Sequence, residues 1–128
     1  MYKELVISII IVIFIIVVEN ITGNYLEESI DSMELGMTDI RNLLLEKKDV
    51  KEIKDKYDSI LSEWKERYEK LAYYVEHDEL EKVETNLVKL KSNIDTQNFD
   101  EGIEKIDEGS FLLEHIRNKD TLNLKNIF

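Results

Sequence analysis

The sequence predicts an all-α protein, in which an N-terminal transmembrane helix is followed by an antiparallel four-helix bundle. Three observations lead to this prediction. A long apolar run stands near the N-terminus, and apolar residues after it recur every three or four positions, which is the spacing of one helix face. The 128 residues also include no proline, so no helix is interrupted by a missing backbone donor.

The apolar run extends from Leu5 to Val18, and Ser8 is its only polar residue. Alone, this run is short for a membrane span and is also compatible with the core of a signal peptide. Extended to residues 1–21 it covers roughly 30 Å as a helix, which matches the hydrocarbon layer of a bilayer. Because no small-residue cleavage site follows it, we expect residues 1–21 to be an uncleaved signal anchor.

Flanking charge predicts the orientation of this anchor. Lys3 precedes the apolar run, and the next basic residue after the run is Arg41. Basic flanks of a span tend to stay in the cytoplasm. We therefore expect a single-pass protein of the cell membrane, with its N-terminus cytoplasmic and its C-terminal module extracytoplasmic.

The overall charge restricts the possible partners. The chain carries 28 acidic and 17 basic residues, a net charge of −11, and almost all of it lies outside the apolar segment. Nucleic-acid binding requires a basic surface, so we expect no nucleic-acid partner. The absence of cysteine excludes disulfides, thiolate metal sites and a cysteine nucleophile.

Residues 22–118 are predicted to form the bundle, and residues 119–128 a short C-terminal tail that packs along it. Polar or charged turns separate four apolar stripes. Asp49 and Asp78 are each followed by glutamate three residues later, so we expect them to cap the second and third helices. The four helices are expected at about 24–46, 50–76, 79–95 and 100–117.

Short connections favour antiparallel neighbours, so an up-down bundle is the expected arrangement, with two long coiled-coil hairpins as the alternative. The segment Thr22-Gly23-Asn24 is a weak helix breaker. It leaves open whether the anchor and the first bundle helix form one long rod. The stripe of that first helix comprises Leu26, Ile30, Met33, Met37, Ile40 and Leu44.

The sequence offers no recognisable catalytic or metal-binding motif. Helical bundles that hold two irons use Glu-x-x-His on two helices, whereas Tyr74 and Leu112 stand three residues before His77 and His115. We expect both histidines near helix C-termini, where they meet the negative end of the helix dipole. The acidic residues lie off the apolar stripes, and no nucleophile motif or phosphate loop is present. We therefore expect no catalytic residue, no metal, no cofactor and no enzyme activity.

Aromatic residues gather along the second helix. Tyr73 and Tyr74 are adjacent, so they cannot both face inward, and one of them is expected to be exposed beside His77. These three residues form the candidate interaction surface, because an exposed aromatic side chain can anchor a partner. The alternative is a half-buried tyrosine at the end of the bundle. The other aromatic residues fit the inward stripe and are expected in the core: Tyr57, Trp64 and Tyr68.

Four features taken together indicate a family. They are the apolar anchor, the charged turn Glu46-Lys47-Lys48-Asp49, Trp64 near the middle of the second helix, and the ending Leu122-Asn123-Leu124-Lys125-Asn126-Ile127-Phe128. On these features the chain resembles, over nearly its whole length, the bacterial family catalogued as domain of unknown function 4363. Members often carry tryptophan directly after the charged turn, where this chain has Val50. The resemblance implies no known activity and suggests a small multi-span membrane protein as partner.

Two functional hypotheses follow. The first is a non-enzymatic accessory or interaction protein that the anchor holds beside a multi-span membrane protein on the extracytoplasmic side, with residues 1–21 in contact with membrane lipid. The second is an extracytoplasmic ligand-sensing four-helix module that acts through a partner. The oligomeric state is left open.

Overall fold

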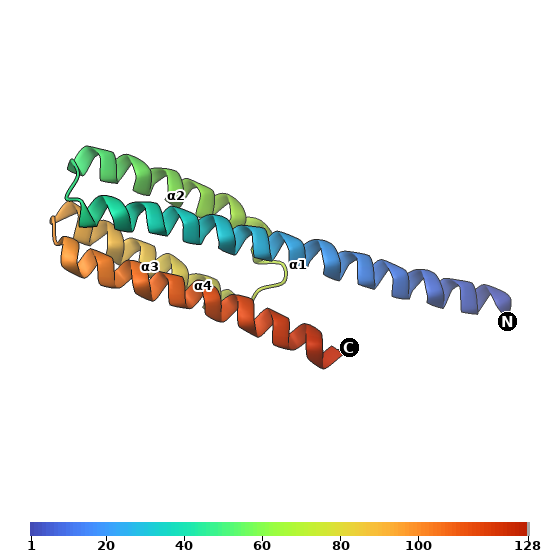
Figure 1. The fold of residues 1–128 in the computed structure, drawn as a ribbon. Helices are drawn as coiled ribbons and strands as arrows, with labels where there is room; N and C mark the ends of the chain where they lie inside the picture. The colour runs from blue at the N-terminus through green and yellow to red at the C-terminus, as the bar shows by residue number, and fades with distance from the viewer. Residues whose placement is uncertain (128) are drawn as a thin grey trace.

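The computed structural model describes residues 1–127, and the side chains of residues 1–120. Each helix packs against the next along the chain, and the last packs against the first (Figure 1). Neighbouring helices run in opposite directions, and residues 1–127 include no strand. The predicted all-α fold, with an apolar N-terminal helix and an antiparallel bundle, is therefore confirmed. The helices are α1 (Tyr2–Leu45), α2 (Val50–Leu71), α3 (His77–Asp95) and α4 (Phe99–Ile127).

The apolar segment and the first bundle helix form one continuous helix. α1 contains 44 residues, which corresponds to about 66 Å of helix. Gly23 keeps a negative φ, and the hydroxyl of Thr22 donates to the backbone carbonyl of Glu19 at 3.1 Å. The weak breaker therefore does not break the helix, and the open question of continuity is answered by a single rod.

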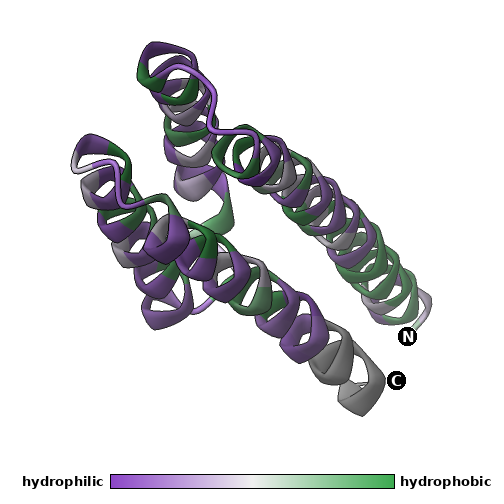
Figure 2. Cartoon of the chain, turned by 60° about the vertical axis from the view of Figure 1, so that its left-hand side comes forward, coloured by the Kyte–Doolittle hydropathy of each residue, from purple (hydrophilic) through white to green (hydrophobic). Residues whose placement is uncertain are grey.

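The first half of α1 projects from the bundle. Its apolar side chains are exposed, and burial begins at Leu26. Figure 2 shows hydrophobic colour along this projecting half, whereas the bundle helices alternate between hydrophobic and hydrophilic turns. Among the described residues, α1 alone is long and apolar enough to cross a membrane, and its most apolar stretch touches no core. This is compatible with a single-pass anchor.

The core runs along the axis of the bundle and contains the predicted stripes. Tyr57 and Trp64 are buried as expected, while Tyr68 is only partly buried and packs at the edge. Asp49 caps α2 as predicted, since its side chain accepts from the backbone N–H of Lys51. All six residues that the helical spacing assigned to the first stripe are buried: Leu26, Ile30, Met33, Met37, Ile40 and Leu44.

The second helix ends earlier than predicted. α2 stops at Leu71 instead of residue 76, because the next backbone donors turn back on the helix. The N–H groups of Tyr73 and Tyr74 donate to the carbonyls three residues earlier, at 3.3 and 3.1 Å. This tightening directs residues 72–76 across the bundle toward α3, and Val75 still packs on the core.

The third helix begins earlier than predicted, and the expected positions of both histidines are wrong. α3 starts at His77 with Glu76 as its N-cap, so Asp78 lies in the first turn instead of capping the helix. There its charge favourably meets the positive end of the helix dipole. His77 therefore stands at a helix N-terminus, and His115 lies well inside α4.

The fourth helix extends beyond the predicted end. α4 runs to Ile127, so the residues predicted as a separate tail, 119–128, continue this helix as far as position 127. The expectation that the tail packs along the bundle concerns side chains from 121 onward, which lie outside the described residues.

Candidate functional site

The end of the bundle from which α1 projects, here called the anchor-side end, is the region of interest. The connection between α2 and α3 lies there, and the last part of α4 extends on the same side (Figure 1). The other two connections lie at the far end. The candidate interaction residues Tyr73, Tyr74 and His77 all belong to the anchor-side end.

These three residues have different surroundings. Tyr73 is 89% exposed. Tyr74 packs against the core, which agrees with the argument that adjacent tyrosines cannot both face inward. The ring of His77 is exposed; its Nδ1 lies 3.1 Å from the Tyr68 hydroxyl and its Nε2 lies 2.9 Å from a carboxylate oxygen of Glu81. Tyr73 is thus the side chain of the three that is open to a partner.

The inward tyrosine has an unusual hydroxyl. The Tyr74 oxygen is buried and has no hydrogen-bond partner among the described residues. Tyr74 lines a cavity of about 40 Å³ together with Ile116 and Asp120, a space that fits one water molecule. Burial, with the nearby Tyr25 and Asp120, raises the pKa of Tyr74 to about 12, so this hydroxyl stays a donor at neutral pH.

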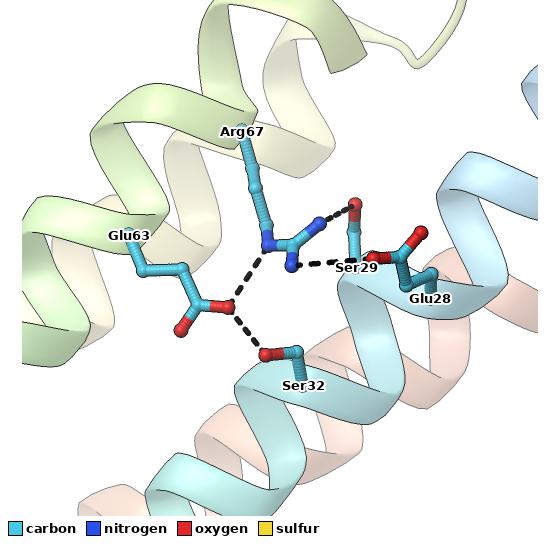
Figure 3. Close-up of polar contacts among 5 residues, drawn as sticks. All are labelled: Glu28, Ser29, Ser32, Glu63 and Arg67. Atoms are coloured by element: carbon cyan, nitrogen blue, oxygen red, sulfur yellow. Dashed lines mark hydrogen bonds and ion pairs between the residues drawn. The ribbon is translucent and has the colours of Figure 1, made fainter.

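A polar network joins α1 to α2 just above the apolar segment (Figure 3). Arg67 donates to the buried hydroxyl of Ser29 at 2.9 Å and to the carboxylate of Glu63 at 3.0 Å. Ser32 donates to the same Glu63 oxygen, and Glu28 lies 4.0 Å from the guanidinium. The planar fork of arginine suits such divergent acceptors, and it holds two helices at once.

The same arginine reaches an aromatic ring on α1. The guanidinium carbon of Arg67 lies 5.7 Å from the ring centroid of Tyr25, and Nζ of Lys70 lies 5.5 Å from it. Both distances fall in the cation–π range. Tyr25 stands one turn above the exposed Ile21, so these contacts hold α1 where it leaves the bundle.

A second arginine joins α1 to α4. Nε of Arg117 lies 3.1 Å from Glu27, and its Nη2 donates to Asp31. Nη1 of the same guanidinium lies 3.0 Å from Glu114, one turn earlier on α4. Arg117 therefore neutralises carboxylates on two helices that meet at the anchor-side end.

A lysine closes the ring of contacts. Nζ of Lys119 on α4 donates to Glu76 at 2.8 Å, at the start of α3. This bond raises the pKa of Lys119 and lowers that of Glu76. We call Arg67, Arg117 and Lys119 the basic collar, because each joins a different pair of segments around the base of α1.

One glutamate contradicts the expectation that acidic residues lie off the apolar stripes. Glu79 is 7% exposed, and it is held between α3 and α4. Its carboxylate lies 3.6 Å from Lys82, 3.8 Å from Lys119 and 3.8 Å from His115. The two lysines compensate the buried charge, which would otherwise be costly.

A carboxyl pair between α1 and α4 is another feature that the sequence did not indicate. Burial raises the pKa of Glu34 to about 7, and a hydrogen bond to Glu114 and the charge of Glu114 add to the effect. Arg117 opposes it, and Asp31 reinforces it. Two close carboxylates cannot both ionise without repulsion, so the pair shares a proton below neutral pH.

An open groove between α3 and α4 has a volume of about 540 Å³. Its lining contains more acidic than basic side chains, including Asp78, Glu81, Glu108, Lys82 and Lys89. Among the side chains that the structure describes, no three His, Cys, Asp or Glu residues are placed to hold a metal ion.

Comparison with known families matches residues 20–127 to the family described as Domain of unknown function (DUF4363). The chain belongs to the DUF4363 family. The matched region begins where the apolar segment ends and covers the whole bundle with its basic collar. No curated protein and no solved structure matches the chain.

In this DUF4363 protein, the collar contacts are the part of the site that sequence reasoning missed. A signal was present, because the chain contains only three arginines among many lysines. Each of them joins different helices: Arg41 on α1 also pairs with Asp107 on α4, at 3.0 Å. Arginine forms forked hydrogen bonds that lysine cannot, so scarce arginines are candidates for contacts between helices.

Proposed function

We propose that this DUF4363 protein is a non-enzymatic accessory subunit that α1 anchors in the cell membrane beside a multi-span membrane protein. The observation that carries the proposal is the continuity of α1, whose first half is exposed and apolar and whose second half is a wall of the bundle. A partner that binds the apolar half of such a helix also fixes the position of the bundle, because both halves belong to one helix.

The basic collar supports this proposal. Arg67 joins α1 to α2, and Arg117 joins α1 to α4, both within three turns of the apolar segment. A displacement of α1 by a membrane partner therefore acts on the other helices directly. A soluble domain on a flexible tether would lack this coupling.

The proposed orientation places the N-terminus in the cytoplasm and the bundle outside. It rests on Lys3 before the apolar segment and the absence of basic residues after it until Arg41. Externally added protease should remove the bundle from intact protoplasts while a cytoplasmic marker protein survives. Protection of the bundle from that protease would reverse the assignment.

Site-specific photo-crosslinking tests the partner. Benzoylphenylalanine replaces Phe14 in the apolar segment or Phe111 on α4, which are 67% and 70% exposed. We expect the probe at position 14 to capture a membrane protein at native expression, and the probe at 111 to serve as the matched control. Recovery of the position-14 variant only as an uncrosslinked monomer would contradict the proposal.

Ligand sensing is the second candidate, and the groove between α3 and α4 is the observation that favours it. The acidic excess of its lining suits small cationic ligands such as amines. Thermal unfolding of the detergent-solubilised protein with diamines, amino acids and small amphiphiles separates the two functions. A saturable rise in melting temperature that Glu108→Gln abolishes would support sensing, and no rise would leave the accessory role.

A further inference from the structure

The anchor-side end of the bundle stands close to Ile21, the last residue of the predicted anchor. Ile21 is 63% exposed, and Leu26, five residues later, is buried in the core. Five residues of helix rise about 7–8 Å, which is comparable to the headgroup layer on one side of a bilayer. A bilayer that covers the apolar segment therefore brings its headgroups up to the bundle.

The side chains at this end have the chemistry of a membrane interface. Tyr73 extends into solvent from the α2–α3 connection, and Tyr25 lies on α1 under the ammonium group of Lys70. Tyrosine is enriched at the headgroup level, because its ring is apolar and its hydroxyl is polar. Lysine next to the interface extends its charged group toward the headgroups.

The local charges permit this approach. Glu76 would oppose an anionic membrane, but its carboxylate is paired at 2.8 Å with Lys119. α4 continues about three turns beyond Arg117 on the same side of the bundle (Figure 1). The α2–α3 connection and the end of α4 thus both lie on the side from which the apolar part of α1 projects.

We propose that the α2–α3 connection, residues 72–76, docks on the lipid headgroups beside the anchor, with Tyr73 at the membrane interface. This contact would fix the depth of the bundle and its tilt relative to the membrane plane. This inference rests on the proposed anchoring of α1 in a membrane.

The absence of cysteine makes a clean experiment possible. Single cysteines are introduced as Phe14→Cys, Ala72→Cys and Lys48→Cys in the full chain, and each is labelled with the fluorophore NBD. Ala72 and Lys48 are both exposed, and Lys48 lies in the α1–α2 connection at the far end. Each protein is reconstituted in phosphatidylcholine–phosphatidylglycerol vesicles that contain either headgroup-level or chain-end nitroxide lipid.

We expect NBD at position 72 to be quenched about twofold more by headgroup-level nitroxide than by chain-end nitroxide, as for a group at the interface. Position 14 should be quenched most by chain-end nitroxide, and position 48 by neither. Tyr73→Ser in the position-72 protein should lower its quenching. That variant retains the buried core, so its circular dichroism should be unchanged.

The three positions separate the two proposals. If NBD is quenched at position 14, but is quenched at position 72 no more than at position 48, the docking is overturned and the anchor stands. A position 14 that neither nitroxide quenches would overturn the anchor itself. Equal quenching of position 72 with and without Tyr73 would overturn the role of that side chain.

Discussion

The hydroxyl of Tyr57 on α2 donates a 2.7 Å hydrogen bond to the backbone carbonyl oxygen of Leu87 on α3. The tyrosine is only 3% exposed, so this bond crosses the helix interface inside the core. Burial raises the pKa of Tyr57 to about 12, and the charges of Asp58 and Asp95 act in the same direction. The hydroxyl therefore remains a donor at any physiological pH.

Removing this hydroxyl should weaken the bundle. We expect Tyr57→Phe to lower the free energy of unfolding by about 0.5–1.5 kcal/mol, the usual contribution of one hydrogen bond. Urea unfolding of the full chain in detergent micelles, followed by near-UV circular dichroism, measures the loss. Tyr73→Phe is the matched control, because the exposed Tyr73 makes no buried contact. An equal loss in both variants would show that the Tyr57 bond is not the cause.

Two glycines should respond in opposite ways to alanine. A Cβ at Gly109 would stand 2.5 Å from both Oδ1 of Asn86 and Cε of Met37, so both side chains would have to shift, although Asn86 is held by a 2.9 Å hydrogen bond to the Lys105 carbonyl. A Cβ at Gly23 would meet nothing within 4 Å. We expect Gly109→Ala to destabilise the fold by about 1–3 kcal/mol, the usual cost of overpacking.

Gly23→Ala is expected to be neutral or stabilising by up to about 1 kcal/mol, because alanine favours the helix. Thermal unfolding of both variants in the same detergent compares them. A stable Gly109→Ala protein would mean that the side chains of Asn86 and Met37 can move aside without cost, contrary to the close packing at this glycine.

The arginine of the α1–α2 network should be difficult to replace. Arg67→Ala leaves the buried Ser29 hydroxyl without its donor, and the partly buried Glu63 keeps only the hydrogen bond from Ser32. We expect a loss of about 1–3 kcal/mol, as for other unsatisfied buried groups. Arg67→Lys should recover only part of it, because one ammonium group cannot reach both acceptors in the same geometry. Lys65→Ala, at an exposed position, is the control, and its unfolding curve should match that of the wild type.

The carboxyl pair predicts a pH dependence. The pKa of Glu34 is about 7 in the folded protein and 4.5 as the ordinary value, so the folded state holds this proton more tightly. The stability that this proton contributes is complete below pH 4.5 and is lost as the pH rises through 7. Glu34→Gln should therefore gain melting temperature relative to the wild type at pH 8, and the gain should vanish near pH 4.5.

Glu76→Gln provides a control of opposite sign. The pKa of Glu76 is lowered by the bond to Lys119, so its contribution is present above the ordinary pKa and is lost on acidification. We expect Glu76→Gln to melt below the wild type at pH 8. At pH 8, a lower melting temperature of Glu34→Gln would contradict the first assignment, and a higher one of Glu76→Gln would contradict the second.

The sequence alone determined the features that depend on neighbours along the chain. Local geometry alone connects the apolar run, the helical spacing of stripes such as Leu26 to Leu44 and the absence of proline to helix formation. The structure confirms the helix over both the apolar run and this stripe. Asp49 was identified as a cap from the glutamate three residues after it, and in the structure its side chain accepts from a backbone N–H two residues away. The exposure of one of two adjacent tyrosines follows from the same geometry.

Only the tertiary structure decided what depends on residues distant in the sequence. α2 ends at Leu71 because the chain must cross to α3, although the apolar spacing continues to Val75. Glu79 is buried because cations from α3 and α4 surround it, and local spacing does not reveal them. The fork of Arg67 is shared between α1 and α2, so its role exists only once the two helices are packed. The sequence shows which charged residues are present, but only the packing of the helices decides which carboxylates pair with the basic collar at the base of α1.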